Sequence, residues 1–337
     1  MIFRKKVIRN SFILLSVALT LAITTTASAQ SVHQAIPRYI PQRVYDSNEK
    51  RFIDFESMLV ELSRADVVFV GEQHDDAATH RLERAILEGL ARRRGNVLVA
   101  MEMFERDVQQ SLDDYFAGRL SEEDFLKTSR PWPRYASDYR SLVEFARFQS
   151  WRVIASNVPR RYASQVSKQG LAAVDVVPAS ERKFIASQIQ CPFDDYFKRF
   201  SEAMNSHPVA DGDGKEPEKM QNDEHRAMIE RFYYAQCIKD ETMAESITEQ
   251  LQLSDKSQQR PLIVHFNGTF HSDYRLGAAA RVNRRLPKSK IKVVTVVPLD
   301  DLDTIKAEEY RKRGDYIVFS LTTELITPPT RIATPIR

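Results

Sequence analysis

Two histidines in this 337-residue sequence occupy matching positions from which they could bind a metal ion. The segments 71–74 and 268–271 share the pattern Gly-x-x-His, and each follows an apolar run typical of a buried strand. Glycine permits a sharp turn there, so the histidine projects over the end of the strand. Imidazoles combined with a carboxylate suit a divalent ion such as zinc or manganese. The candidate metal ligands are His74, His271, Glu102 and His80.

A metal at these residues would permit hydrolysis of a peptide or an ester. The ion would activate water, and Glu72 or Glu102 would act as the base. The same histidines could instead cap a helix or bond a loop carbonyl, and His80 could be an ordinary surface residue. The chain would then be a non-catalytic module that binds a partner. The sequence has no G-x-S-x-G, P-loop, G-x-G-x-x-G or H-E-x-x-H motif, so the enzyme classes marked by those motifs gain no support.

The elements that must position these residues alternate between strands and helices, which predicts an α/β fold with a mostly parallel sheet flanked by helices. In such a sheet, ligands bind beyond the carboxyl ends of the strands. Glu72, Glu102, Asn157 and His271 follow four of the expected strands at that end. The strands are expected at Asp66–Val70, Val97–Met101, Val153–Ser156, Pro261–Phe266, Ile291–Val297 and Tyr316–Leu321.

About a hundred residues between the third and fourth strands, 158–260, have no clear strand and predict a helical insertion that forms a cap. Helical periodicity covers 194–206 and 221–251, with a polar loop at Asn205–Lys219. On the longer helix, Gln236, Asp240 and Met243 are spaced i, i+4 and i+7 and share one face. The α/β core is then divided into residues 30–157 and 261–326, followed by a tail at 327–337.

Residues 1–29 have the pattern of a cleavable signal peptide: a basic start, an apolar run over Ser11–Thr24, and Ala-Ser-Ala at 27–29. The run is shorter than the roughly 20 residues of a membrane span. We therefore expect no stable membrane span, cleavage near Ala29, and a periplasmic or secreted protein. No lipobox cysteine follows the cleavage site. In an oxidising compartment Cys191 and Cys237 could form a disulfide, with two buried free thiols as the alternative.

The net charge of +3 depends on this leading segment. Residues 1–29 contain four basic residues and no acidic residue, so 45 basic and 46 acidic residues remain, a net charge of −1. A surface that binds a polyanion gains no support from this balance, and we expect no nucleic-acid partner.

Five motifs are similar to those of a known family and occur in the expected order. They are GEQHDDAATH, AMEMFERDVQQ, the W-x(6)-Y spacing of Trp132 and Tyr139, VIASNVPR and AQCIKDETMAESI. Together they resemble the ChaN-like haem-binding uptake proteins of the Tiki superfamily, which also includes Tiki proteases and erythromycin esterases. The resemblance extends from about Asp54 to Tyr316.

The resemblance implies an exported protein that binds haem at the carboxyl ends of the strands and acts in bacterial haem or iron uptake, with a homodimer as a candidate assembly. By motif position, Tyr139 becomes a candidate ligand of the haem iron, for which a histidine nitrogen is the alternative. The superfamily's metal or catalytic positions fall on His74, His271 and Glu102. The other cofactor-binding candidates are Asn157, Asp240 and Met243.

Overall fold

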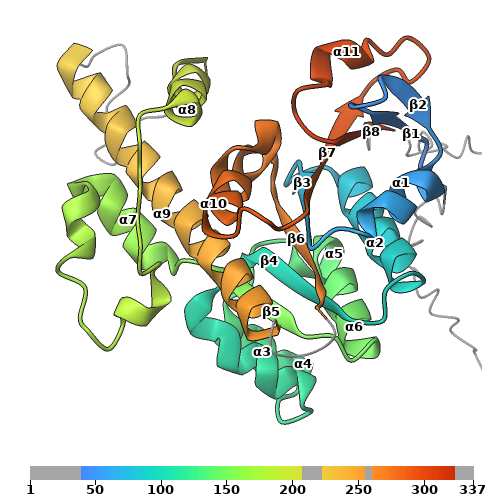
Figure 1. Ribbon diagram of the computed structural model, residues 1–337. Helices are drawn as coiled ribbons and strands as arrows, with labels where there is room; N and C mark the ends of the chain where they lie inside the picture. Colours follow the sequence, from blue (N-terminus) through green and yellow to red (C-terminus); the bar gives the residue numbers. More distant parts are fainter. Residues whose placement is uncertain (1–38, 207–221, 255–259, 323–337) are drawn as a thin grey trace, which may run out of the picture. The chain divides into compact units, whose positions relative to one another are not determined.

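The computed structural model describes residues 39–206, 222–254 and 260–322, which contain one eight-stranded sheet flanked by helices (Figure 1). The strand order is β2-β1-β8-β7-β3-β6-β4-β5. The strands from β8 to β5 are parallel, and β1 and β2 add an antiparallel edge. The predicted α/β class with a mostly parallel sheet is therefore confirmed. The strands are β1 (Gln42–Asp46), β2 (Arg51–Ile53), β3 (Val67–Glu72), β4 (Val97–Glu105), β5 (Val153–Asn157), β6 (Leu262–Gly268), β7 (Ile291–Leu299) and β8 (Tyr316–Leu321).

Alternating side chains on the central strand β3 build the two apolar layers. Val68 and Val70 join a cluster on one face, and Val67 and Phe69 join a cluster on the other. Because successive side chains of a strand point to opposite faces, a continuous apolar run is what a strand covered on both sides requires. Helices α1 (Phe55–Leu62), α2 (Ala77–Ala91) and α6 (Arg140–Phe148) pack on the first face, and α9 (Asn222–Ser254) and α10 (Gly277–Arg285) pack on the second.

The sequence did not predict the two edge strands. β1 has five residues, of which three are buried, and β2 has three residues, none of them buried. Such short, partly exposed strands lack the apolar run that marks the parallel strands. In the described sheet, β1 pairs with β8, and β2 pairs only with β1. Their presence does not alter the edge where the polar residues gather.

The segment between β5 and β6 contains helices and, in its described part, no strand. Helices α8 (Asp195–Ser206) and α9 contact one another beside the sheet (Figure 1). Most of the loop expected at Asn205–Lys219 lies outside the described residues, as do the expected signal peptide and tail. The remaining helices are α3 (Gln109–Phe116), α4 (Glu122–Ser129), α5 (Tyr135–Asp138), α7 (Arg160–Gln169) and α11 (Ala307–Tyr310), with 3-10 turns η1 (Arg106–Val108), η2 (Leu171–Val174), η3 (Arg182–Phe184), η5 (Thr269–His271) and η6 (Asp273–Arg275).

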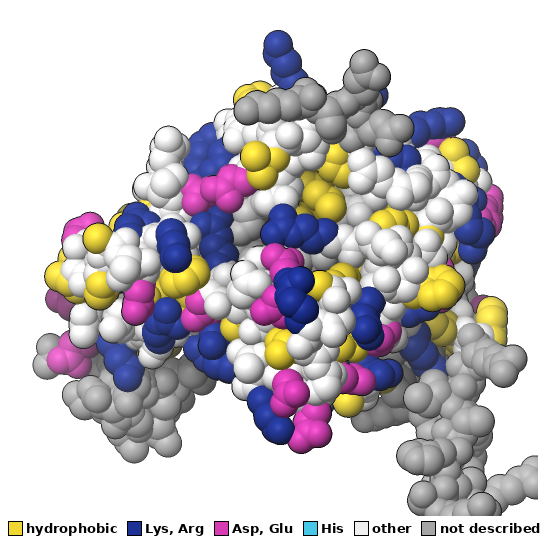
Figure 2. Space-filling view, turned by 90° about the horizontal axis from the view of Figure 1, so that it is seen from below, with side chains coloured by type: hydrophobic (Ala, Val, Ile, Leu, Met, Phe, Trp, Pro, Cys, Tyr) yellow, Lys and Arg dark blue, Asp and Glu magenta, His cyan; other side chains and the backbone are white. Residues whose placement is uncertain are grey.

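Surface charge in the described part of the chain is mixed. On the face shown in Figure 2, basic and acidic side chains are interspersed rather than gathered by sign. No described helix combines the length and the apolar character that a membrane span needs.

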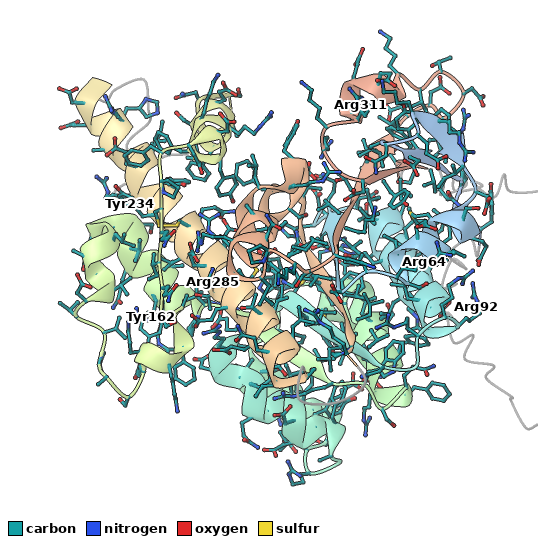
Figure 3. The ribbon with its side chains drawn as sticks, viewed as in Figure 1. Arg64, Arg92, Tyr162, Tyr234, Arg285 and Arg311 are labelled. Atoms are coloured by element: carbon teal, nitrogen blue, oxygen red, sulfur yellow. A yellow bond between two sulfur atoms is a disulfide. The ribbon has the colours of Figure 1, made fainter. Side chains whose placement is uncertain are left out.

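A disulfide joins Cys191 to Cys237, across 46 residues of sequence, and fastens the segment before α8 to α9 (Figure 3). We expect replacement of both cysteines by serine to lower the free energy of unfolding by about 3 kcal/mol, because the cross-link restricts the unfolded chain. Urea unfolding of the oxidised protein and of the variant measures this difference. The wild type treated with dithiothreitol is the control, and equal midpoints for all three samples would contradict the expectation.

Candidate functional site

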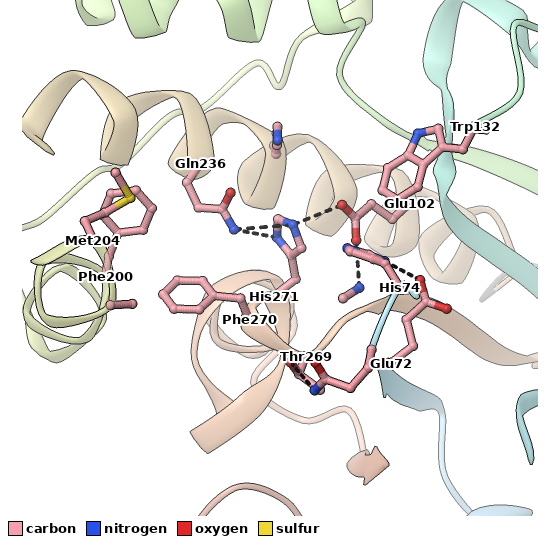
Figure 4. A pocket seen from close by; sticks show the side chains of 14 residues that line it. Glu72, His74, Glu102, Trp132, Phe200, Met204, Gln236, Thr269, Phe270 and His271 are labelled. Carbon is pink, nitrogen blue, oxygen red and sulfur yellow. Dashed lines mark hydrogen bonds and ion pairs between the residues drawn. The ribbon is translucent and has the colours of Figure 1, made fainter. Parts of the chain in front are cut away.

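The carboxyl ends of the parallel strands bring four polar residues together. β3 ends at Glu72, two residues before His74. Glu102 lies in β4, which is separated from β3 by one strand, β6. Between them, β6 ends at Gly268 and leads directly into η5, which carries His271. Because these strands are parallel, their ends meet at one edge, and the side chains converge there as Figure 4 shows.

The first imidazole–carboxylate pair faces the open side of this edge. The Nδ1 atom of His74 lies 2.5 Å from Oε1 of Glu72, and the same oxygen accepts a hydrogen bond of 2.9 Å from the hydroxyl of Tyr139. The Glu72 side chain is fully buried, whereas that of His74 is 47% exposed. Burial opposes the charge of His74, but the hydrogen bond with Glu72 and the nearby Glu102 outweigh it and raise the pKa of His74.

The second imidazole lies deeper, between two carboxylates. Nε2 of His271 is 3.1 Å from Glu102, and Nδ1 is 2.7 Å from Asp240 on α9. Burial alone would lower the pKa of His271, but Glu102 and Asp240 outweigh it and raise the pKa to about 9. Burial alone would also raise the pKa of Glu102, and His271 and His74 instead hold it well below its usual range. The imidazole of His271, between Glu102 and Asp240, is therefore the group that holds a proton here.

Glu72, His74, Glu102 and His271 line a cleft of about 490 Å³. Its sides carry large apolar side chains, and Lys239 and Gln236 of α9 add polar groups. Figure 4 places Phe200, Met204 and Phe270 on one side of His271 and Trp132 on the other. A cleft with apolar walls and a few convergent polar groups is the usual form of a site for a small organic ligand.

The structure brings together His74, His271 and Glu102 from the strand ends and Asp240 from α9, and it places the other candidates around them. His80 lies in the core with Nδ1 3.0 Å from both Glu72 and Glu83. Tyr139 is 2% exposed and holds Glu72 from beneath, rather than lining the cleft.

Asn157 and Met243 also lie outside the cleft lining. The Asn157 amide donates to the backbone carbonyl of Glu102 over 3.1 Å, so it holds that strand end in place. Met243 is fully buried in the apolar cluster between α9 and the sheet. Of the three residues on the expected stripe of α9, Gln236 and Asp240 contact His271. Met243 instead packs in the apolar cluster between α9 and the sheet.

Several residues at the site were not among the sequence candidates. The apolar walls come from Phe200 and Met204 of α8 and from Phe270 of η5. Tyr196 of α8 donates a hydrogen bond of 2.7 Å to Asp240. The aromatic residues of the segment 193–200 were visible in the sequence, but nothing in their spacing indicates that α8 would fold over the end of β6.

Comparisons with known proteins identify both the fold and a family. The model of the family described as haem-binding uptake, Tiki superfamily, ChaN matches residues 58–282. The structure of ChaN from Campylobacter jejuni, described as showing cofacial haem binding, is similar with a TM-score of 0.60 at 18% identity, over 83% of this chain and 96% of that one. That likeness shows the shared fold.

Two further proteins are similar to this chain over most of its length. An erythromycin esterase in its open conformation covers 84% of this chain and 83% of its own, at 12% identity and a TM-score of 0.42, which is too low to support a functional comparison. The chloroplast protein RETICULATA-RELATED 5 of Arabidopsis thaliana is 24% identical over 77% of this chain. The chain spans about a third of that protein's length, 35%.

Proposed function

We propose that this chain, which belongs to the ChaN family of haem-binding uptake proteins in the Tiki superfamily, binds haem in the cleft at the carboxyl ends of its strands. The observation that carries the proposal is the open imidazole of His74 among apolar walls. Haem is a flat apolar molecule with an iron that takes an axial nitrogen or oxygen ligand.

His74 is suited to hold the iron. Its Nδ1 atom is bound to Glu72, and no described residue forms a hydrogen bond with its Nε2 atom. Histidines that bind metals usually have their other ring nitrogen fixed by a carboxylate or a carbonyl, which sets the tautomer and the ring orientation. His271 is less suited, because both of its ring nitrogens are already paired with carboxylates.

Tyr139 is better suited to support His74 than to bind iron itself. Burial, followed by the charge of Glu72, raises the pKa of Tyr139 far above that of a free phenol, which disfavours the phenolate. Its hydroxyl is also committed to Glu72. We infer that Tyr139 positions Glu72, which in turn positions His74.

The other residues that line the cleft suit the porphyrin ring and the propionate groups of haem. Trp132, whose ring packs edge-on against His74 with centroids 5.0 Å apart, and Phe200, Met204 and Phe270 offer apolar contact with a porphyrin. Lys239 supplies a cation within the lining for a propionate group. These residues would bind the haem, orient its porphyrin ring and exclude water from it.

Two independent features support a role outside the cytoplasm. The signal-peptide pattern of residues 1–29 predicts export, and a structural disulfide is typical of proteins in oxidising compartments. We propose that the protein handles haem during iron acquisition after export.

Titration of the haem-free protein with hemin tests the proposal. We expect a shifted Soret band that saturates at micromolar protein and gives the number of haems per chain. Sedimentation of the protein with and without hemin tests whether a homodimer forms. A Soret band identical to that of free hemin throughout the titration would refute the proposal.

Substitution of Gly268 tests the position of His74. A β-carbon at Gly268 would lie 2.7 Å from Nε2 of His74, so the imidazole must move, although the backbone conformation suits alanine. We expect Gly268→Ala to weaken hemin binding roughly tenfold, as overpacking costs about 1–3 kcal/mol. Gly95→Ala is the control, because no atom lies within 4 Å of its added carbon. Equal affinities in the two variants would contradict the placement of His74.

A further inference from the structure

A cluster of side chains that could hold a metal ion lies behind the cleft, in the core between β3 and α2. Glu72, His80 and Glu83 each offer one ligand atom, and these atoms lie within 4.8 Å of one another. The side chains of Glu72 and Glu83 are fully buried and that of His80 is 3% exposed. Of these residues only Glu72 also lines the cleft.

The hydrogen bonds around His80 fix which nitrogen faces the carboxylates. Nε2 lies 3.1 Å from the backbone carbonyl of His74, and because a carbonyl can only accept, Nε2 carries a hydrogen. Nδ1 then faces Oε2 of Glu72 and Oε2 of Glu83, each at 3.0 Å. A single hydrogen on Nδ1 can be donated to one of these oxygens but not to both.

His80 therefore leaves part of this cluster without a hydrogen-bond partner. The hydrogen bond of His80 is made to Glu83, and Oε2 of Glu72 has no hydrogen-bond partner among the described residues. Oε1 of Glu83 is also without one. Arg134 pairs with Asp138 rather than with either glutamate. Buried carboxylate oxygens without a partner are costly, so a cation placed between them would stabilise the cluster.

We propose that Glu72, His80 and Glu83 bind one divalent transition-metal ion, of the type of Zn²⁺ or Mn²⁺. Two carboxylates and a neutral imidazole suit such an ion, and its two charges balance those of the carboxylates. The ion takes the place of the hydrogen on Nδ1, which leaves to solvent as a proton. The carbonyl of His74 orients the other ring nitrogen, as is usual for a ligating histidine.

The ion would also organise the bottom of the cleft. It would fix Glu72 through Oε2, while Oε1 holds His74 and Tyr139. The site does not depend on haem binding, because Glu83 and His80 lie outside the cleft lining.

Metal titration of the EDTA-treated, haem-free protein tests the inference. We expect isothermal titration calorimetry with Zn²⁺ and, separately, Mn²⁺ to give about one ion per chain, with release of protons that appears as a dependence of the heat on the buffer. Glu83→Gln should lower the affinity at least tenfold. Glu88→Gln, an exposed position on the same helix, should leave it unchanged.

X-ray absorption at the zinc edge then identifies the ligands. One imidazole in the zinc shell supports the buried cluster, whereas two or more would assign the ion to His74 and His271 and overturn the inference. No binding of either ion to the wild type would also overturn it. If Glu83→Gln does not fold, the imidazole count and proton release in the wild type still decide the matter, and hemin titration of the same sample tests the haem site separately.

Discussion

Replacing His74 by alanine is expected to lower the affinity for hemin by about 100-fold and to change the Soret spectrum. The substitution removes the one imidazole of the cleft lining whose Nε2 atom has no hydrogen-bond partner among the described residues. Loss of a metal ligand costs at least as much as loss of its supporting partner, which is worth 10- to 100-fold in affinity. Absorption titrations of the wild type and the variant measure the change.

His225→Ala serves as the matched control, because His225 lies on α9 outside the cleft lining. Free imidazole should restore the wild-type spectrum to the His74→Ala complex by filling the space left by the side chain. If His74→Ala binds hemin with the affinity and spectrum of the wild type, the iron is held elsewhere.

Replacing His271 by alanine is expected to destabilise the protein by about 4 kcal/mol near neutral pH. The substitution leaves Glu102 and Asp240 buried without the imidazolium between them, and removing one partner of a buried ion pair typically costs about 3–5 kcal/mol. Urea unfolding followed by circular dichroism measures the free energy, with His225→Ala as the control. A loss below 1 kcal/mol would mean that the two carboxylates are neutral or hydrated.

The same residue predicts how stability depends on pH. The pKa of His271 is raised to about 9 in the folded protein, from an ordinary value near 6.5. Its contribution is therefore fully present below pH 6.5 and is lost as pH rises through 9, a change of about 3 kcal/mol. We expect the difference in stability between the wild type and His271→Ala to shrink over that range. A difference that stays constant from pH 6 to 10 would contradict the charged state of His271.

The sequence was most informative where local pattern and topology act together. The apolar runs that end at Glu72 and Gly268 are continuous because both faces of these strands are covered, so their position could be read from the chain. Parallel pairing then places the following residues at one edge, which is why the proximity of His74 and His271 to Glu102 was predictable.

The burial of each side chain could not be predicted from strand pattern and topology. His80 and His74 lie six residues apart, but His80 turns inward because the first turn of α2 packs on the core, where Glu83 meets it. Tyr139 was a candidate iron ligand by motif position, and its side chain is buried with its hydroxyl bonded to Glu72. Burial of this kind depends on how α2, α5 and α6 pack on β3, and no periodicity in the sequence describes that packing.

The packing of the helices between β5 and β6 was equally hard to predict, because it depends on residues far apart in the sequence. The helical character of α8 and α9 was visible in the sequence, and Asp240, one of the residues on the expected stripe of α9, contacts His271. The contacts of Phe200 with the cleft depend on the fold of the segment that Cys191 ties to α9. Because this disulfide joins residues 46 positions apart, the spacing of residues within α8 does not reveal which side of the helix faces the sheet.

A crystal structure of the hemin complex is the most direct test of the proposed haem site. We predict one porphyrin in the cleft, between Trp132 and Phe270, with its iron bonded to Nε2 of His74 and with Tyr139 still hydrogen-bonded to Glu72. Iron bonded to the oxygen of Tyr139, or a porphyrin bound away from the strand ends, would contradict it.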